Sequence, residues 1–327
     1  QGQSDPITYS CSCKAAERGG EVLLFYRYWT NDPQLPLELR DLAYSLGGKI
    51  RVASEGYNVT VAGTKDEIES FIEECCSHWS FTGLSLGTKE ARDRFFKPSE
   101  GCACVFNRVA NVRVAAEITP MGIQDYLPQD WNIIESLSPE EFHQRCHEEN
   151  ALLLDVRNHY ESRIGYFVDP HNGEAAIRPQ IRRFSQWPQY LKNAGVFDPN
   201  GKQILTYCTG GIRCEKAVRW MKENTTQSAP VSTLKGGVAA YLAWMDDEIS
   251  SGRKQPSESL FKGRNYVFDA RGSTSLSHGP EPVSTCHICG QSSSQLNKCQ
   301  SKGCHLVLVV CLDCSDKDIR CCSSCKE

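Results

Sequence analysis

Two cysteines six residues apart, Cys208 and Cys214, enclose a glycine-rich stretch with the sequence CTGGIRC. An apolar run, KQILTY, precedes the first cysteine, and helix-forming residues follow the second. Glycines allow successive backbone N–H groups to point inward, and a helix N-terminus carries partial positive charge. Both features stabilise a thiolate, as does the fixed cation of Arg213. The pattern therefore predicts that Cys208 is a nucleophile with a depressed pKa.

Two other interpretations of this stretch are a structural cysteine and a phosphatase loop. Cys208 could be a small buried strand residue, since free cysteines are often buried, but packing does not explain the glycine pair and the arginine. A phosphatase loop needs a wider spacing to surround a tetrahedral phosphate, and only four residues separate Cys208 from Arg213. For Cys214 a resolving role and simple packing in the first helical turn remain equally open.

Several neighbours are expected to support the cysteine. The residues that would shape the loop around the sulfur are Thr209, Gly210, Gly211 and Ile212. Asp155 and Arg157 end an apolar strand, and we expect them to form a structural salt bridge beneath the loop. Gly236 and Gly237 are expected to permit a turn and close packing.

The elements around this loop predict an α/β domain at about residues 131–250. A capped helix (LSPEEFHQRC), apolar strands (ALLLDVR, KQILTYC, VSTL) and helices after the glycine turns alternate along the chain. Continuous apolar strands that alternate with helices are typical of a mainly parallel sheet. Such sheets bind ligands at the carboxyl ends of their strands, where Cys208 lies.

An earlier segment has a different pattern. Residues 20–118 contain a β-α-β-β-α-β order, which predicts a ferredoxin-like α+β domain. LPLELRDLAYSLGG has helical spacing and ends at a glycine pair, and KIRVASEGYNVTVAG predicts two strands around a turn. Thr64 and Glu67 form the capping-box pattern of a second helix. NVRVAAEI is the expected last strand.

The C-terminal segment 286–327 is rich in cysteine. It holds nine of the chain's 18 cysteines, and clustered pairs are typical of metal sites. The predicted ligands of two structural zinc ions are Cys286, Cys289, Cys299, Cys304, Cys311, Cys314, Cys322 and Cys325. The first pair could share an ion with the third and the second with the fourth, and Cys321 could replace Cys322. His287 and His305 are expected to be neighbours rather than ligands.

Two further parts of the chain are less informative. Residues 251–285 are rich in Ser, Gly, Pro and charge, apart from RNYVFDA, and predict a linker before the cysteine-rich module. Cys11-x-Cys13 and Cys102-x-Cys104 could together hold a metal, but free thiols are the preferred interpretation.

The composition excludes several classes of protein. The net charge is −4 and charged residues make up 23% of the 327 residues, so no global basic field indicates a nucleic-acid partner. The longest apolar run, LVLVV, is too short to span a bilayer, and no signal peptide is visible. Together with the reactive thiol, this predicts an intracellular protein, cytoplasmic or organellar, without a membrane partner. Nothing in the sequence indicates an oligomeric state.

Sequence motifs along most of the chain resemble those of a known family. ALLLDVRNHYESRIGYF, YCTGGIRCEKA and TLKGGVAAYLAW look like the strand, active-site loop and final glycine pair of a rhodanese domain. CTGGIRCEK, IRVASEGYNVTVAGT, GRNYVFDAR and the cysteine tail are similar to rhodanese-containing tRNA uridine hydroxylases and their eukaryotic relatives, the thiosulfate sulfurtransferase/rhodanese-like domain proteins. By this resemblance Cys208 is the active-site cysteine, Arg213 the loop arginine and Cys214 a second family cysteine.

The resemblance implies oxygen-dependent hydroxylation of the wobble uridine of tRNA at carbon 5. Because no flavin, haem or two-His-one-carboxylate pattern is evident, and no other organic cofactor is indicated, the Cys208 thiolate would add to carbon 6 of the uracil. Arg182 and Arg183 in IRPQIRRF could hold phosphates or form a solvated face. The segment NRVANVRVAAEITP is less basic than the corresponding family strand. The alternatives are a thiosulfate or persulfide sulfurtransferase with a Cys208 persulfide, and a non-catalytic binding module with a rhodanese fold.

Overall fold

The structure is a computed structural model that describes residues 20–29, 34–101, 103–106, 109–123, 126–193, 201–225, 229–304 and 306–325. These residues divide into two compact units, one that ends at Trp131 and one that begins at Asn132. Each unit has its own sheet and its own buried core. Among the described residues no helix is long and apolar enough to cross a membrane.

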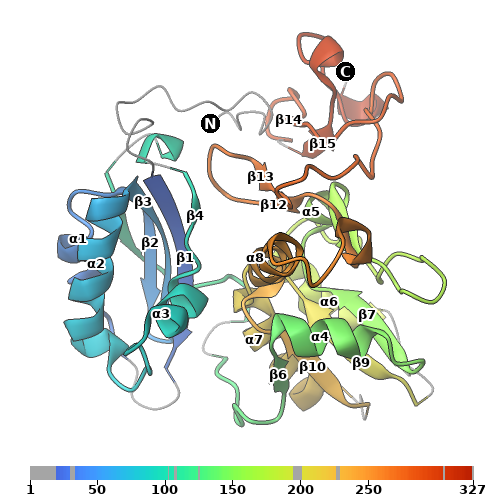
Figure 1. The fold of residues 1–327 in the computed structure, drawn as a ribbon. Helices are drawn as coiled ribbons and strands as arrows, with labels where there is room; N and C mark the ends of the chain where they lie inside the picture. The colour runs from blue at the N-terminus through green and yellow to red at the C-terminus, as the bar shows by residue number, and fades with distance from the viewer. Residues whose placement is uncertain are drawn as a thin grey trace. The chain divides into compact units, whose positions relative to one another are not determined.

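The N-terminal unit contains a five-stranded sheet with α2 along one face (Figure 1). Its strands are β1 (Gly20–Tyr28), β2 (Gly47–Ala53), β3 (Gly56–Thr64), β4 (Ser99–Glu100) and β5 (Asn111–Val114), in the order β4-β1-β3-β2-β5. Its helices are α1 (Leu39–Leu42), α2 (Lys65–Ser77), η2 (Trp79–Phe81), α3 (Lys89–Phe96) and η3 (Ala103–Val105). The predicted capping box at Thr64 and Glu67 is confirmed at the start of α2. The rings of Phe25 and Phe96 pack edge to face in the core, with their centroids 4.9 Å apart.

The expected last strand is present, but this unit departs from the expected fold in two places. The strand expected to close the domain is β5, but it pairs in parallel with β2, while Ser99–Glu100 takes the place beside β1. Alternation predicts a strand but not the edge that it joins. The predicted first helix is the single turn α1, and the glycine pair belongs to β2. A Cβ at Gly48 would lie 2.4 Å from the Thr60 carbonyl oxygen, so glycine there serves the close approach of two strands.

The second unit contains the predicted parallel sheet. Its strands are β6 (Glu135–Leu137), β7 (Ala151–Asp155), β9 (Gln203–Tyr207) and β10 (Val231–Leu234), all parallel, in the order β6-β10-β9-β7. Its helices are α4 (Pro139–Cys146), α5 (His159–Ser162), η4 (Phe184–Gln186), α6 (Trp187–Asn193), α7 (Ile212–Asn224) and α8 (Gly237–Ser250). Helices α4 and α8 contact each other, as do α6 and α7. β9 is an inner strand, so the residue after it emerges between two neighbours.

The segment predicted as a linker is folded onto this unit. It contains η5 (Pro256–Glu258), β11 (Phe261–Gly263), β12 (Asn265–Tyr266) and β13 (Ser273–Thr274). β11 pairs with β8 (Gly165–Phe167), and β12 pairs with β13. Leu260, Phe261 and Leu276 are buried in the same core as Phe167. Composition suggested a linker because three short strands separated by polar turns leave no long apolar pattern.

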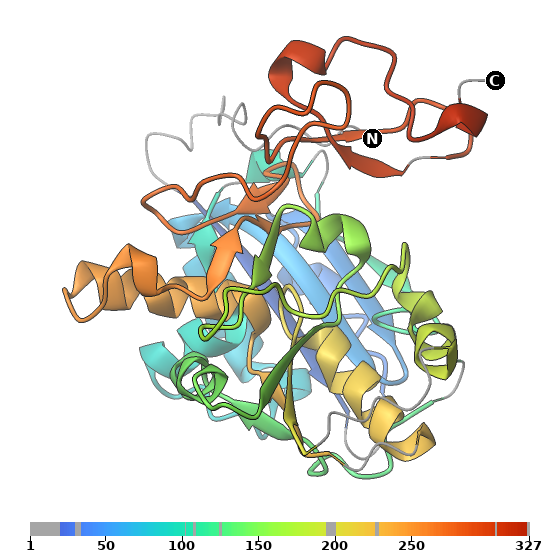
Figure 2. The same cartoon turned by 90° about the vertical axis from the view of Figure 1, so that its right-hand side faces the viewer.

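The cysteine-rich tail consists of loops around one short hairpin, drawn in red in Figure 2. The hairpin strands are β14 (Leu296–Lys298) and β15 (Val307–Val309), followed by the turns η6 (Leu312–Cys314) and η7 (Ser323–Cys325). Leu296, Val307 and Val309 share a small buried cluster with Ile164 and Tyr266. The rest of the tail's core is built largely from its own cysteines.

Candidate active site

Cys208 lies directly after β9, at the carboxyl edge of the parallel sheet, and is fully buried. The chain then turns through Gly210 and Gly211 into α7. Gly211 has φ +99°, a conformation that L side chains rarely adopt. Its N–H donates a hydrogen bond to the Cys208 sulfur over 3.2 Å. The glycine turn thus brings a backbone donor to the thiol, as the sequence predicts.

The glycine pair before α8 fixes the loop from the other side. Gly237 has φ +65°, and a Cβ there would lie 2.4 Å from the Cys208 carbonyl oxygen. The N–H groups of Val238 and Ala239 donate to the carbonyls of Cys208 and Thr209, over 2.9 and 3.0 Å. The prediction that the pair permits a turn and close packing is confirmed. The N-terminus of α8 therefore anchors the backbone of the nucleophile.

Arg213 is held by a carboxylate that the sequence analysis did not identify. The Arg213 Nη1 and Nη2 atoms donate to the two oxygens of Glu161 over 2.6 and 2.7 Å. The hydroxyl of Thr209 donates to Glu161 Oε1 over 3.0 Å and also accepts from Arg213. Glu161 is fully buried, and its neighbour Arg213 lowers its pKa although burial acts in the opposite direction. The loop cation is thus fixed in one orientation by a bidentate pair.

A local signal in the sequence could have pointed to Glu161. Asn158 and Glu161 form the N-x-x-E pattern of a capping box at the start of α5. The Asn158 N–H donates to Glu161 Oε2 over 3.1 Å. The pattern predicts that the carboxylate folds back over the helix N-terminus, but nothing in it predicts contact with a residue 52 positions away.

Asp155 and Arg157 form the expected salt bridge. Arg157 Nη2 lies 2.6 Å from Asp155 Oδ2, and both side chains are fully buried. Arg157 also donates to the Gly165 carbonyl over 2.6 Å, and its guanidinium lies 5.4 Å from the ring of Tyr207. Tyr207 immediately precedes Cys208, and Asp155 is the last residue of β7. The Asp155–Arg157 ion pair therefore stabilises the ends of β7 and β9 next to the loop.

The electrostatics of the loop favour a thiolate at Cys208. Burial alone would raise its pKa, but a hydrogen bond from the Cys214 thiol, the charge of Arg213 and the N–H groups of these two residues lower it to about 6. Burial and the hydrogen bond to Cys208 raise the pKa of Cys214 well above its ordinary value. The site therefore holds one ionised sulfur and one protonated sulfur side by side at neutral pH.

The basic residues after β8 lie along the same edge of the sheet. The Ile181 carbonyl accepts from the N–H of His159, two residues before Glu161. Arg182 and Arg183 follow Ile181 directly and are exposed. Arg178 is partly buried, with its guanidinium 4.3 Å from the ring of Tyr166.

The tail brings eight cysteines into two groups of four. The first group is Cys286, Cys289, Cys311 and Cys314, and the second is Cys299, Cys304, Cys321 and Cys325. Within each group the sulfur atoms lie within 4.8 Å of one another. The interleaved arrangement, first pair with third and second with fourth, is confirmed.

The structure favours one of two alternatives that the sequence left open for the second group. Cys321, not Cys322, completes the second group. The Cys322 carbonyl accepts from the Cys325 N–H at the start of η7, and its side chain is exposed. Spacing favoured Cys322 because it repeats the two-residue gap of Cys286–Cys289 and Cys311–Cys314, whereas the turn directs the preceding residue inward. His287 is exposed and hydrogen bonds to the Arg320 carbonyl, as expected of a neighbour.

Some predictions fall on residues that the structure does not describe. Cys11, Cys13, Cys102 and His305 lie outside the described residues. Cys104 is described and partly buried.

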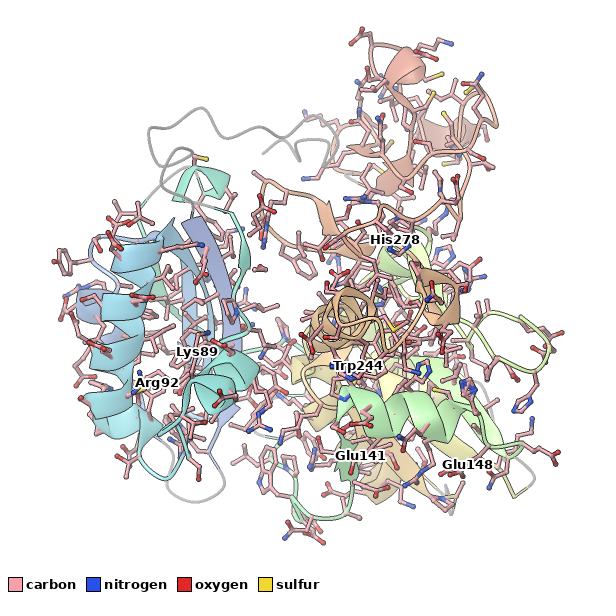
Figure 3. The ribbon with its side chains drawn as sticks, viewed as in Figure 1. Lys89, Arg92, Glu141, Glu148, Trp244 and His278 are labelled. Carbon is pink, nitrogen blue, oxygen red and sulfur yellow. The ribbon has the colours of Figure 1, made fainter. Side chains whose placement is uncertain are left out.

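A separate hollow of about 630 Å³ lies beside the C-terminal end of α4. His143 lines it and accepts or donates a 2.9 Å hydrogen bond with the Tyr241 hydroxyl. Trp244 of α8, which is labelled in Figure 3, packs next to this histidine with the ring centroids 5.3 Å apart. None of the loop residues 208–213 lines this hollow, so Cys208 and the hollow are separate features.

Comparisons with known proteins cover nearly the whole chain. Residues 20–118 match the UPF0176 acylphosphatase-like domain, 138–243 the rhodanese-like domain and 262–326 the rhodanese C-terminal domain. The tRNA uridine(34) hydroxylase of Leptospira interrogans is 33% identical, over 92% of this chain and 76% of that protein. Those of Staphylococcus haemolyticus and Buchnera aphidicola are 31% and 30% identical, over 92% of this chain and 87% and 86% of theirs. The chain belongs to the family of tRNA uridine(34) hydroxylases.

Proposed function

We propose that this protein hydroxylates uridine 34 of tRNA at carbon 5, with molecular oxygen as co-substrate and Cys208 as the nucleophile. The observation that carries the proposal is the loop around Cys208, which lowers the pKa of a buried thiol to about 6 in a chain whose relatives are named for this reaction. A nucleophilic cysteine must be ionised, and a pKa of about 6 favours the thiolate of Cys208 at neutral pH.

The loop supplies what addition to a uracil ring requires. The Cys208 thiolate would add to carbon 6, which places negative charge on carbon 5 and the adjacent carbonyl oxygen. That electron-rich carbon would then react with oxygen. Arg213 is fixed by Glu161 beside the sulfur, so it contributes a positive potential without reorganisation during the reaction. The Gly211 N–H would stabilise the thiolate before attack and again when it leaves.

The exposed basic residues at the same edge support a tRNA substrate. Arg182 and Arg183 would contact phosphates close to the loop, with Arg178 behind them. Burial is the main cause of the lowered pKa of His159, and the nearby charges of Arg163 and Arg178 lower it further. Replacing Arg182 and Arg183 by Gln should weaken tRNA binding and reduce its salt dependence. An unchanged salt dependence would remove these residues from the binding surface.

We further infer that the tail holds two zinc ions, one in each group of four cysteines. Four thiolates suit the tetrahedral coordination of structural zinc. With zinc–sulfur bonds of about 2.3 Å, neighbouring sulfurs in a tetrahedron are about 3.8 Å apart. Cys289 and Cys311 are 3.5 Å apart, and Cys304 and Cys321 are 3.6 Å apart. Each group has four protein ligands, which supports a structural rather than a catalytic role.

Nucleoside analysis tests the proposed reaction. tRNA from cells that lack this protein would be compared after complementation with the wild type or with Cys208→Ala. We expect 5-hydroxyuridine derivatives to return with the wild type and to remain absent with the variant. Equal hydroxylation by Cys208→Ala would overturn the role of the cysteine. Unchanged tRNA, together with a persulfide on Cys208, would instead indicate sulfur transfer.

A further inference from the structure

The proposed reaction leaves two electrons unaccounted for. Converting the C5–H bond of uridine to C5–OH with molecular oxygen places one oxygen atom in the product. The second oxygen atom becomes water, which requires two electrons and two protons from a reductant. The inference below rests on the proposed function and concerns the source of these electrons.

We infer that Cys208 and Cys214 supply both electrons, and that each turnover ends with a disulfide between them. The Cys208 sulfur accepts a 3.2 Å hydrogen bond from the N–H of Gly211, which is the N-cap of α7. Cys214 is the third residue of α7, in the turn whose N-cap N–H donates to the Cys208 sulfur. Both thiols are reduced in the structure, and their residues are no more than 1% exposed. Two buried cysteines, six residues apart, thus lie at the N-terminal turn of α7, where oxygen would react.

The steps balance in atoms and electrons. The Cys208 thiolate forms a bond to carbon 6, and the electron pair at carbon 5 forms a bond to oxygen, which gives a C5 hydroperoxide after protonation. The Cys214 sulfur attacks the outer oxygen, the O–O bond breaks, and the products are a C5 hydroxyl and a Cys214 sulfenic acid. Loss of the C5 proton expels Cys208 and restores the C5–C6 double bond.

The last step closes the disulfide. The released Cys208 thiolate attacks the Cys214 sulfenic acid, and hydroxide leaves as water after protonation. The sum is uridine, oxygen and two thiols on one side, and hydroxyuridine, water and a disulfide on the other. A low-molecular-weight or protein thiol must then reduce the disulfide before the next turnover.

The surroundings of Cys214 distinguish it from the other buried thiols of this unit. Cys146 is equally buried, but it packs in the apolar core with Phe142 and Leu153. Cys214 instead lies in the first turn of α7, beside the cation Arg213. Its raised pKa keeps it protonated until the hydroperoxide forms. Burial also shields the sulfenic acid from other thiols until Cys208 is released.

A single-turnover experiment on the wild-type protein tests the inference without relying on any variant. The full chain is reduced, freed of external thiol and mixed with unmodified tRNA and oxygen. We expect about one hydroxyuridine per chain and a protein mass lower by two hydrogen atoms, with the disulfide mapped to the peptide containing Cys208 and Cys214. Adding dithiothreitol should restore multiple turnovers. Many turnovers without a thiol, or one turnover without a disulfide, would overturn the inference.

A matched pair of variants provides the second test. Cys214→Ser should lower the single-turnover yield at least about tenfold and form no disulfide, because no second sulfur can reduce the hydroperoxide. Cys146→Ser removes another buried thiol of the same unit and should hydroxylate like the wild type. Wild-type yields from Cys214→Ser would refute the inference while leaving the proposed function intact. Absence of hydroxyuridine from the wild type, with or without thiol, would instead refute the proposed function.

Discussion

The thiols of the active-site loop and those of the tail are stabilised in opposite ways. In the loop one sulfur, that of Cys208, is surrounded by donors: the Gly211 N–H lies 3.2 Å away and Arg213 lies beside it. In the tail the sulfurs face one another, as Cys289 and Cys311 do at 3.5 Å. A lone thiolate can be stabilised by hydrogen bonds and a cation, whereas four adjacent thiolates repel one another unless a metal ion compensates their charge.

This difference suits the loop thiols to the proposed reaction and the tail thiols to metal-dependent folding. The loop is shaped by an apolar sheet, a buried ion pair and glycine contacts, so its geometry does not depend on the cysteine itself. The tail has only a small core, largely of cysteines, so bound metal would provide much of its folding energy. Mutations in the two regions should therefore have different consequences.

The largest effect is expected from Cys208→Ala. Hydroxylation should fall by about a thousandfold or more, because the covalent step is lost. The free energy of unfolding should change by only about 1 kcal/mol, and metal content should stay the same. Single-turnover assays, denaturant unfolding and metal analysis check the three parts. A large loss of stability would show that the loop depends on its nucleophile after all.

Glu161→Gln should affect the loop through Arg213. Removing one partner of a buried ion pair leaves an uncompensated charge, and we expect the second unit to lose about 3–5 kcal/mol of unfolding free energy. Asp247→Asn is the matched control: its partner Arg253 is 3.0 Å away, but both side chains are more than half exposed. That change should cost less than about 1 kcal/mol. Equal effects from the two substitutions would contradict the structural importance assigned to Glu161.

The pH dependence should distinguish the two regions by slope. Only the thiolate of Cys208 attacks, so single-turnover hydroxylation should be nearly constant above pH 7 and fall about tenfold per pH unit below its pKa of about 6. Release of metal from the tail requires several thiolates to be protonated, so metal occupancy should fall with a steeper slope. Rapid assays across pH and metal analysis after equilibration measure the two curves. Equal slopes would contradict the proposed difference.

The smallest effect on the reaction is expected from the tail. Cys321→Ser should reduce the metal content from about two ions per chain to about one, whereas Cys322→Ser should leave it unchanged. Both variants should retain hydroxylation within about tenfold of the wild type, since neither touches the loop. Metal analysis on matched preparations decides between the neighbouring cysteines. Metal loss from Cys322→Ser alone would restore the ligand set predicted by spacing.

The sequence pattern was sufficient to predict the structural features that depend on neighbouring residues. The capping box at Thr64, the glycine turn after Cys208 and the alternation of strands and helices in the second unit each follow from neighbouring residues, and each is present. The presence of clustered cysteine pairs in the tail was also predictable, but their spacing left open which pairs share a group.

Other features were decided only in three dimensions. Glu161 meets Arg213 across 52 residues because α5 and the loop share one edge of the sheet. Three other features likewise depend on which surfaces meet. They are the sheet edge that β5 joins, the packing of residues 251–285, and the choice of Cys321 over Cys322. The sequence by itself determined the glycine turn after Cys208 and the difference between the loop cysteines and the clustered cysteines of the tail. The tertiary structure decided which distant carboxylate orients the cation, because burial selects charge partners by proximity in space.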